Sequence, residues 1–193
     1  MISFEGMKSE AASTGYPMLP AGPYIAKITG VHIDGEKPNQ SLVIRTEITE
    51  GEYKDYFTKR YQNDSQGKYT AKYKGDYRLR IPHPESNSAY PESDKRRFND
   101  AIYRIETSNP GYRFDGDEKK FIGKAVGINM QAGTYNDAPF TTIGRFETVD
   151  DIRKGMIKEM KPKKPKYSDD YQKQDDAPAP SGFTPVEDVE IPF

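Results

Sequence analysis

The alternation of apolar and polar residues over residues 40–49 constrains the fold more than any other feature of this chain. Four side chains point to one side of an extended backbone here: Leu42, Ile44, Thr46 and Ile48. Arg45 and Glu47 point to the other side. This period of two predicts a strand with one buried face, and a strand buries such a face only when it pairs with others. We therefore expect a β-sheet.

A bent strand is expected before this segment, over residues 22–33. Its apolar residues alternate up to Ile28 and resume at Val31 with the opposite parity, and Gly30 stands at the change. A glycine where the alternation slips is typical of a bulge or a sharp bend. The strand is therefore expected to change direction near Gly30.

The next segments are less regular. Residues 53–62 alternate aromatic and basic side chains after the turn at Glu50-Gly51, which favours a third strand. Residues 63–91 are rich in Gly, Asn, Ser, Tyr and Lys and have only weak periodicity. We expect a long loop or an inserted hairpin there.

An amphipathic helix is expected after Pro91, with Ser93 as its cap. Four apolar residues at helical spacing form one stripe: Phe98, Ala101, Ile102 and Ile105. Residues 109–111, Asn-Pro-Gly, end it.

Two strands follow, over residues 121–130 and 140–146, with a turn between them. Residues 148–151, Thr-Val-Asp-Asp, resemble a capping box and predict a short helix around Ile152. The order strand, strand, strand, helix, strand, strand matches the OB-fold, a mainly β, five-stranded Greek-key barrel with a helix between its third and fourth strands. Other small β-barrels and α+β sheets share this order.

Composition excludes several classes of protein. The chain has no cysteine and only two histidines, His32 and His83, which leaves little for disulfides, zinc sites or Ser-His-Asp chemistry. No apolar stretch approaches the roughly 20 residues of a membrane-spanning helix. The first residues do not resemble a secretory signal. These features favour a soluble, cytoplasmic binding protein.

The net charge of −1 combines two unequal parts. Residues 167–193 hold seven acidic side chains and one lysine, so this part carries −6 and residues 1–166 carry +5. A basic body with an acidic tail is expected where one part meets a polyanion, although a solvated tail without a partner has the same composition.

Four parts are expected along the chain. Residues 1–19 form a loosely attached lead-in, and residues 20–160 form the OB-fold domain. Residues 161–186 form a disordered linker, because this basic and then Pro-rich polar stretch cannot bury enough apolar surface to fold. Residues 187–193 form an acidic partner-binding tip.

Aromatic and basic side chains are interleaved between residues 53 and 80. Single-stranded nucleic acid is bound by such a mixture, because cations follow the phosphates while rings stack on unpaired bases. Tyrosine is also a good strand former, so about half of these rings are expected to face inward. Tyr69, Tyr73 and Tyr77 are expected outside. The candidate DNA-binding residues are Tyr56, Lys59, Arg60, Tyr69, Tyr73, Tyr77, Arg78 and Arg80, with Lys124 and Arg145 on later strands.

Catalytic signals are absent from the sequence. There is no phosphate-binding glycine loop, and the acidic run at residues 115–118 is too short for a calcium loop. We expect no enzyme activity, no cofactor and no metal.

The chain ends in acidic residues followed by Ile191-Pro192-Phe193. This ending resembles the C-terminal tip of bacterial and phage single-stranded-DNA-binding proteins, although Val189 stands where that family usually has an aspartate. The layout of the body, with Leu19–Tyr24 leading into the first strand and Gly123–Gly127 in the fourth, resembles phage-encoded members.

The resemblance implies an OB-fold body that coats single-stranded DNA without sequence preference during replication, recombination or repair. It also implies a tip that recruits partner enzymes, inside a bacterial cell or the bacterial host of a bacteriophage. Phe193 offers a ring and a carboxylate to an apolar pocket rimmed by cations. The candidate partner-binding residues are Asp188, Glu190, Ile191, Pro192 and Phe193.

Two alternatives remain open. One is a recombination mediator or annealing protein that acts as a larger ring, and the other is a phage virion assembly protein that does not bind nucleic acid. A homo-oligomer is possible, and the sequence does not determine the oligomeric state, because no assembly signal is visible in it.

Overall fold

The computed structural model describes residues 16–66, 70–136 and 138–163. Tyr69, the linker from residue 164 onward and the C-terminal tip lie outside the described residues, as do residues 1–15 of the lead-in.

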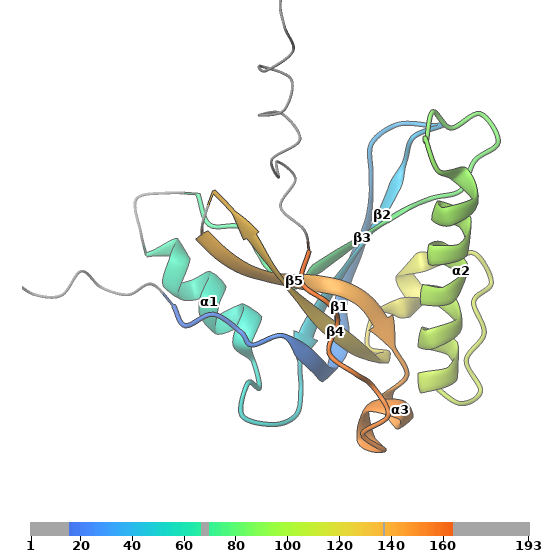
Figure 1. Ribbon diagram of the computed structural model, residues 1–193. Helices are drawn as coiled ribbons and strands as arrows, with labels where there is room; N and C mark the ends of the chain where they lie inside the picture. Colours follow the sequence, from blue (N-terminus) through green and yellow to red (C-terminus); the bar gives the residue numbers. More distant parts are fainter. Residues whose placement is uncertain (1–15, 67–69, 137, 164–193) are drawn as a thin grey trace, which may run out of the picture. The chain divides into compact units, whose positions relative to one another are not determined.

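Five antiparallel strands form one sheet in the order β3-β2-β1-β4-β5 (Figure 1). The strands are β1 (Gly22–Asp34), β2 (Ser41–Ile48), β3 (Asp76–Arg80), β4 (Ala125–Tyr135) and β5 (Ala138–Glu147). The helices are α1 (Tyr56–Ser65), α2 (Pro91–Ser108) and α3 (Val149–Arg153), with a short 3-10 turn, η1 (Glu118–Phe121). The expectation of a mainly β fold with five strands is confirmed.

The bend expected in the first strand is present. The pairing of β1 with β2 shifts register between Ile28 and Gly30. The first half of β1 pairs with β4, from Gly22 to Lys27, and the second half continues along β2. One bent strand therefore joins the two halves of the sheet.

The third strand was expected in the wrong place. Residues 56–65 form helix α1, and β3 lies at residues 76–80, inside the stretch expected to be a loop or hairpin. The reason is tertiary: the carboxylate of Glu47 on β2 accepts hydrogen bonds from the backbone N–H groups of Phe57 (3.0 Å) and Thr58 (2.7 Å). These are donors that a helix N-terminus leaves free, and a carboxylate there also meets the helix dipole favourably.

The two edges of the sheet approach each other through side chains. The rings of Tyr77 on β3 and Phe146 on β5 lie with their centroids 4.6 Å apart in the core. Among the described residues, however, no ladder of backbone hydrogen bonds joins β3 to β5, so the sheet stays open along this line. The expected barrel closure is not observed.

Helix α2 lies between β3 and β4 in sequence, as expected for the helix of this fold. Ala101 and Ile105 of its apolar stripe are buried, and Phe98 and Ile102 pack against the core at its margin. The side chain of Asn109, just after the helix, donates to the carbonyl of Ala125 and accepts from its N–H. This pair of bonds fixes the end of α2 to the start of β4.

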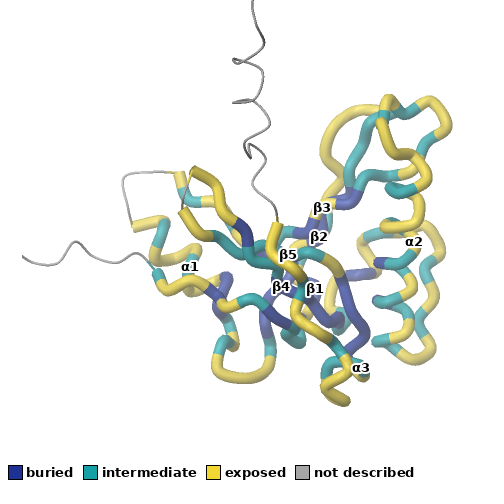
Figure 2. The backbone as a smooth tube through the Cα atoms, viewed as in Figure 1, coloured by how far each residue is buried: buried dark blue, intermediate teal, exposed yellow. Residues whose placement is uncertain are grey.

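The folded body begins before residue 20. Leu19 is fully buried, and its backbone N–H donates to the Tyr56 hydroxyl at 2.8 Å. The same hydroxyl donates to the carbonyl of Pro17 at 2.7 Å. Figure 2 shows the buried positions concentrated along the strands. Residues 16–19 are thus attached to α1 and the core.

Residues 156–163, called the strap below, cross the outer side of β4 and β5. Asn129 and Gln131 donate to the carbonyls of Lys158 (3.0 Å) and Lys161 (2.7 Å). Met160 packs so closely on Gly144 that an added Cβ would come within 2.5 Å of the Met160 sulfur. The strap therefore covers part of the outer face of this half of the sheet. Helix α3, capped by Thr148 as expected, leads into the strap.

Candidate nucleic-acid interface

Strand register gathers three arginines on the outer side of β2 and β3. Opposite the core face, Arg45 on β2 pairs with Asp76, and Arg78 of β3 pairs with Val43. Arg80 pairs with Ser41. Since alternate residues of a strand share a face, these side chains point the same way. We call this surface the arginine face: Arg45, Arg78 and Arg80, with His32, which is exposed, and Val43, which is on the same side of its strand but only 4% exposed.

Arg45 and Arg78 are each held by a carboxylate while remaining exposed to solvent, and Arg80 is half-buried. Arg45 makes two parallel bonds to Asp76, at 2.9 and 3.2 Å, and Arg78 lies 2.6 Å from a carboxylate oxygen of Asp34. The Arg45 and Arg78 side chains are still 45% and 57% exposed. Exposed pairs of this kind are weak, so a stronger anion can exchange with the carboxylates.

Two ion pairs of this face favour the charged forms of their members. Hydrogen bonding to Asp76 raises the pKa of Arg45, and the Arg78 guanidinium lowers the pKa of Asp34. Arg45 and Asp34 are therefore charged at neutral pH.

The ring of Tyr73 packs against the guanidinium of Arg45. The guanidinium carbon of Arg45 lies 4.6 Å from the centre of the Tyr73 ring, within the range of a cation–π contact. The Tyr73 hydroxyl lies 3.0 Å from both the Thr46 carbonyl and a Glu47 carboxylate oxygen. Burial, followed by the charge of Glu47, raises the pKa of Tyr73. Arg45 is thus presented on a fixed, neutral ring.

A hollow of about 770 Å³ lies at the Asp76 end of the arginine face. Tyr73 and Asp76 form the wall next to the face, and α1, residues 16–18, the β4–β5 hairpin and Lys163 form the others. We call it the aromatic hollow, because four rings line it: Tyr16, Tyr73, Tyr135 and Phe140.

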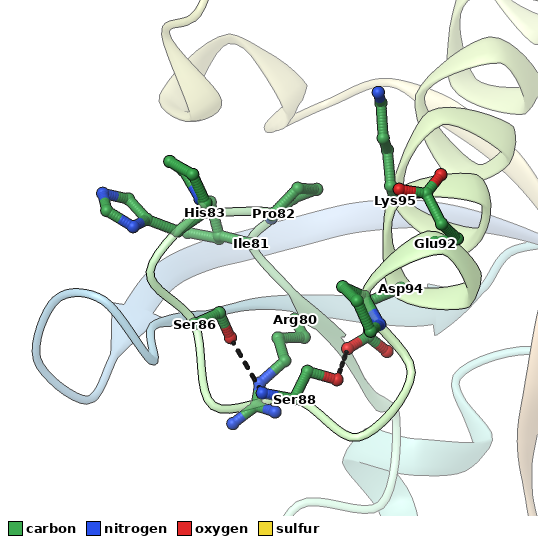
Figure 3. Close-up of a pocket in the computed structure, with 11 residues that line it drawn as sticks. Arg80, Ile81, Pro82, His83, Ser86, Ser88, Glu92, Asp94 and Lys95 are labelled. Carbon is green, nitrogen blue, oxygen red and sulfur yellow. Dashed lines mark hydrogen bonds between the residues drawn. The ribbon is translucent and has the colours of Figure 1, made fainter.

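A second pocket, of about 450 Å³, lies at the Arg80 end, between the loop after β3 and the start of α2 (Figure 3). Arg80 lines it and donates to Asn87 at 3.2 Å. Asn39, in the β1–β2 loop, accepts from the backbone N–H of Asn87 at 3.1 Å and so ties this pocket to the hairpin of the arginine face. The face therefore runs between two concave ends.

Two of the candidate DNA-binding residues are core residues instead. Tyr56 is 4% exposed, with its hydroxyl bonded to residues 17 and 19, and Tyr77 is 5% exposed against Phe146. The expectation that Tyr77 lies outside is wrong, because its strand is β3 and alternation turns residue 77 toward the core. Neither ring can stack on a base.

The other candidates are scattered. Arg78 and Arg80 lie on the arginine face, and Tyr73 and Arg60 line the aromatic hollow. Lys59 is exposed on α1 and donates to the carbonyl of Lys54. Lys124 lies far along the chain over the ring of Tyr112, and Arg145 is bound to Glu147 on β5. Four of the candidates therefore lie on the arginine face or in the hollow next to it.

Arg45 is the residue that sequence reasoning missed. Its outward position followed from the alternation of residues 40–49, but its role depends on β3 lying next to β2. Because the third strand was expected at residues 53–62, Arg78 and Arg80 were not placed beside it. Alternation in residues 76–80 was the signal that would have found this neighbour.

Comparison with known proteins adds no relative: no protein-family model and no curated protein matches the chain. Within the described ranges, no helix is long and apolar enough to cross a membrane. The same ranges hold no cluster of three histidine, aspartate or glutamate side chains suited to a metal ion.

Proposed function

We propose that this protein binds single-stranded DNA on its arginine face, as a binding protein and not as an enzyme. The observation that carries this proposal is the alignment of Arg45, Arg78 and Arg80 on one side of two neighbouring strands, β2 and β3. Such cations gain affinity for phosphates by releasing the counterions of the nucleic acid, and this gain needs no particular base sequence.

We also propose that the fold is an OB-fold. The strand order β3-β2-β1-β4-β5 follows from a central β1 paired on both sides, with α2 between β3 and β4. This is the order of a Greek-key barrel opened between its third and fifth strands. In OB-folds the second and third strands and the β1–β2 and β4–β5 loops bind oligonucleotides. The position of the arginine face on β2 and β3, next to a hollow lined by the β4–β5 hairpin, supports this proposal.

The preference for single strands over duplex follows from rings beside the cations. Tyr135 at the tip of the β4–β5 hairpin is 64% exposed, and Tyr61 on α1 is 42% exposed next to Tyr73. Exposed rings stack on unpaired bases, whereas the bases of a duplex are already stacked. A partner-recruiting role for residues 187–193 rests on their sequence and remains a part of this proposal.

The test is fluorescence anisotropy of a labelled oligo-dT at two salt concentrations, beside a duplex of matched length. We expect salt-sensitive binding to the single strand and much weaker binding to the duplex. Equal affinity for both would point to a general polyanion binder. No binding at low salt would refute the DNA role and favour an assembly protein.

A further inference from the structure

The aromatic hollow is lined by more cationic than acidic side chains. Three cationic side chains line it: Arg60 from α1, Lys74 from the segment before β3, and Lys163 at the end of the strap. The one acidic residue in its wall, Asp76, is already bonded twice by Arg45. The hollow is therefore electropositive.

These cations have few protein partners. Within the part of the chain that the structure describes, neither Lys74 nor Lys163 forms a salt bridge. Arg60 donates to the Tyr56 hydroxyl at 3.2 Å and forms a long ion pair with Asp64, at 3.6 Å. Two lysines without a carboxylate partner, beside this weakly paired arginine, are the arrangement that an anionic ligand requires.

One ring of the hollow, that of Phe140, is positioned by a glycine. Phe140 on β5 lies opposite Gly133 on β4, and an added Cβ at Gly133 would come within 2.6 Å of the Phe140 ring. The ring therefore lies directly over the glycine backbone. Tyr135, two residues along β4, is 64% exposed beside it. Flat exposed surfaces next to cations suit a ligand that combines a phosphate with a base.

The number of cations selects the kind of phosphate. A phosphodiester inside a strand carries one negative charge, whereas a phosphate monoester carries about −1.5 to −2 at pH 7. Three cations around one hollow match the monoester better. The volume of about 770 Å³ is within the usual range for small-molecule sites.

We propose that the aromatic hollow binds a nucleoside monophosphate group, supplied by the phosphorylated end of a DNA strand. This deepens the proposed function and rests on it, because Tyr73 borders both the hollow and the arginine face and would let one strand run from the face into the hollow. The protein would then recognise strand ends in addition to coating strands.

The experiment compares three oligo-dT strands of equal length: one with a 5′-phosphate, one with a 3′-phosphate and one with hydroxyls at both ends. The fluorophore sits on the end opposite the phosphate. We expect one of the phosphorylated strands to bind about tenfold more tightly than the hydroxyl strand, through new charge-assisted hydrogen bonds. The hydroxyl strand alone reports on the proposed function.

Matched variants assign the preference to the hollow. Lys74→Gln and Lys72→Gln each remove one exposed charge from the same segment, but only Lys74 lines the hollow. We expect Lys74→Gln to reduce the preference for the phosphorylated end severalfold and Lys72→Gln to keep it. Gly133→Ala, which displaces the Phe140 ring, should reduce it as well.

Free dTMP against thymidine separates the hollow from strand binding. In calorimetric titrations of the full chain, dTMP should bind and thymidine should bind more weakly, even if no oligonucleotide binds. Binding of dTMP together with equal affinities for the three strands would show a mononucleotide site and overturn the strand-end role. Equal affinities for the three strands and no binding of dTMP would overturn the inference altogether.

Discussion

The outer faces of the two halves of the sheet differ in what happens to their arginines. On β1, β2 and β3 the arginine face is open, and Arg45 and Arg78 are paired with partly exposed carboxylates. On β4 and β5 the strap covers part of the sheet, and Arg145, although its side chain is 48% exposed, is committed to the buried Glu147. One half keeps its cations available to a ligand, and the other uses them within the fold.

Glu147 shows how the covered half works. Its side chain is fully buried and accepts from Arg104 of α2 at 2.9 Å and from Arg145 at 2.5 Å. Asn129 adds a weaker contact at 3.4 Å and also holds the strap through Lys158. A buried charge needs such partners, because removing it from water is costly. The comparison teaches that an arginine on an outer face is evidence for ligand binding only when no buried acid requires it.

The largest expected effect comes from Glu147→Gln. This change removes the buried charge that Arg104 and Arg145 share, although Arg104 keeps Asp100 at 3.3 Å, and should lower the free energy of unfolding by about 2 kcal/mol. Urea titrations followed by circular dichroism measure it. Glu159→Gln, at an exposed position in the strap, is the control and should change stability by less than about 0.5 kcal/mol. If both variants are equally stable, Glu147 does not hold the covered half together.

Two matched substitutions, one in each half of the sheet, test this comparison. Arg145→Gln should cost about 1 kcal/mol of stability and leave oligo-dT affinity nearly unchanged, since this arginine serves Glu147. Arg78→Gln should do the reverse: stability stays within about 0.5 kcal/mol and affinity falls severalfold. Denaturation and anisotropy on the same two proteins measure both quantities. Loss of DNA affinity in Arg145→Gln would extend the interface onto β5.

A smaller effect is expected at alkaline pH. Burial raises the pKa of Tyr24 to about 12, and burial with the charge of Glu47 raises that of Tyr73, whereas both titrate near 10 in the unfolded chain. The unfolded chain therefore loses these protons first, and the free energy of unfolding should fall as pH rises from 10 toward 12. Below pH 10 these groups add no slope.

Variants identify the groups responsible for this slope. Tyr24→Phe and Tyr73→Phe should each flatten the dependence of stability on pH between 10 and 12. Tyr103→Phe, at a ring that is 60% exposed on α2, should keep the wild-type profile. A wild-type profile in Tyr73→Phe would mean that the ring beneath Arg45 is not held in its neutral form by its surroundings.

Regular alternation made much of the fold predictable. The strand at residues 40–49, the break at Gly30 and the stripe of α2 are local patterns that burial enforces directly. Helix α1 was missed because its start depends on Glu47, a residue of strand β2 that precedes the helix by nine positions. The helix propensity of residues 56–65 cannot reveal a cap that is supplied by a residue outside that segment.

The candidate site was less predictable than the fold. Interleaved rings and cations indicated the right region, but alternation within β3 sends Tyr77 inward and Arg78 outward, and this parity depends on where the strand begins. The contact of Arg45 with Tyr73 joins residues 28 positions apart and follows only from the pairing of β2 with β3. Residue types suggested the chemistry, and register decided which residues share a face.

The salt dependence of oligo-dT binding tests the central claim most directly, in three proteins: the wild type, Arg45→Gln/Arg78→Gln, and the control Lys158→Gln/Lys161→Gln on the strap. All measurements are made under conditions in which the three proteins are folded. We expect the arginine variant to bind at least tenfold more weakly and to lose about two units from the slope of log affinity against log salt, with the control close to the wild type. Equal slopes in the wild type and the arginine variant, or a larger loss in the strap variant, would contradict the assignment of the interface to the open half of the sheet.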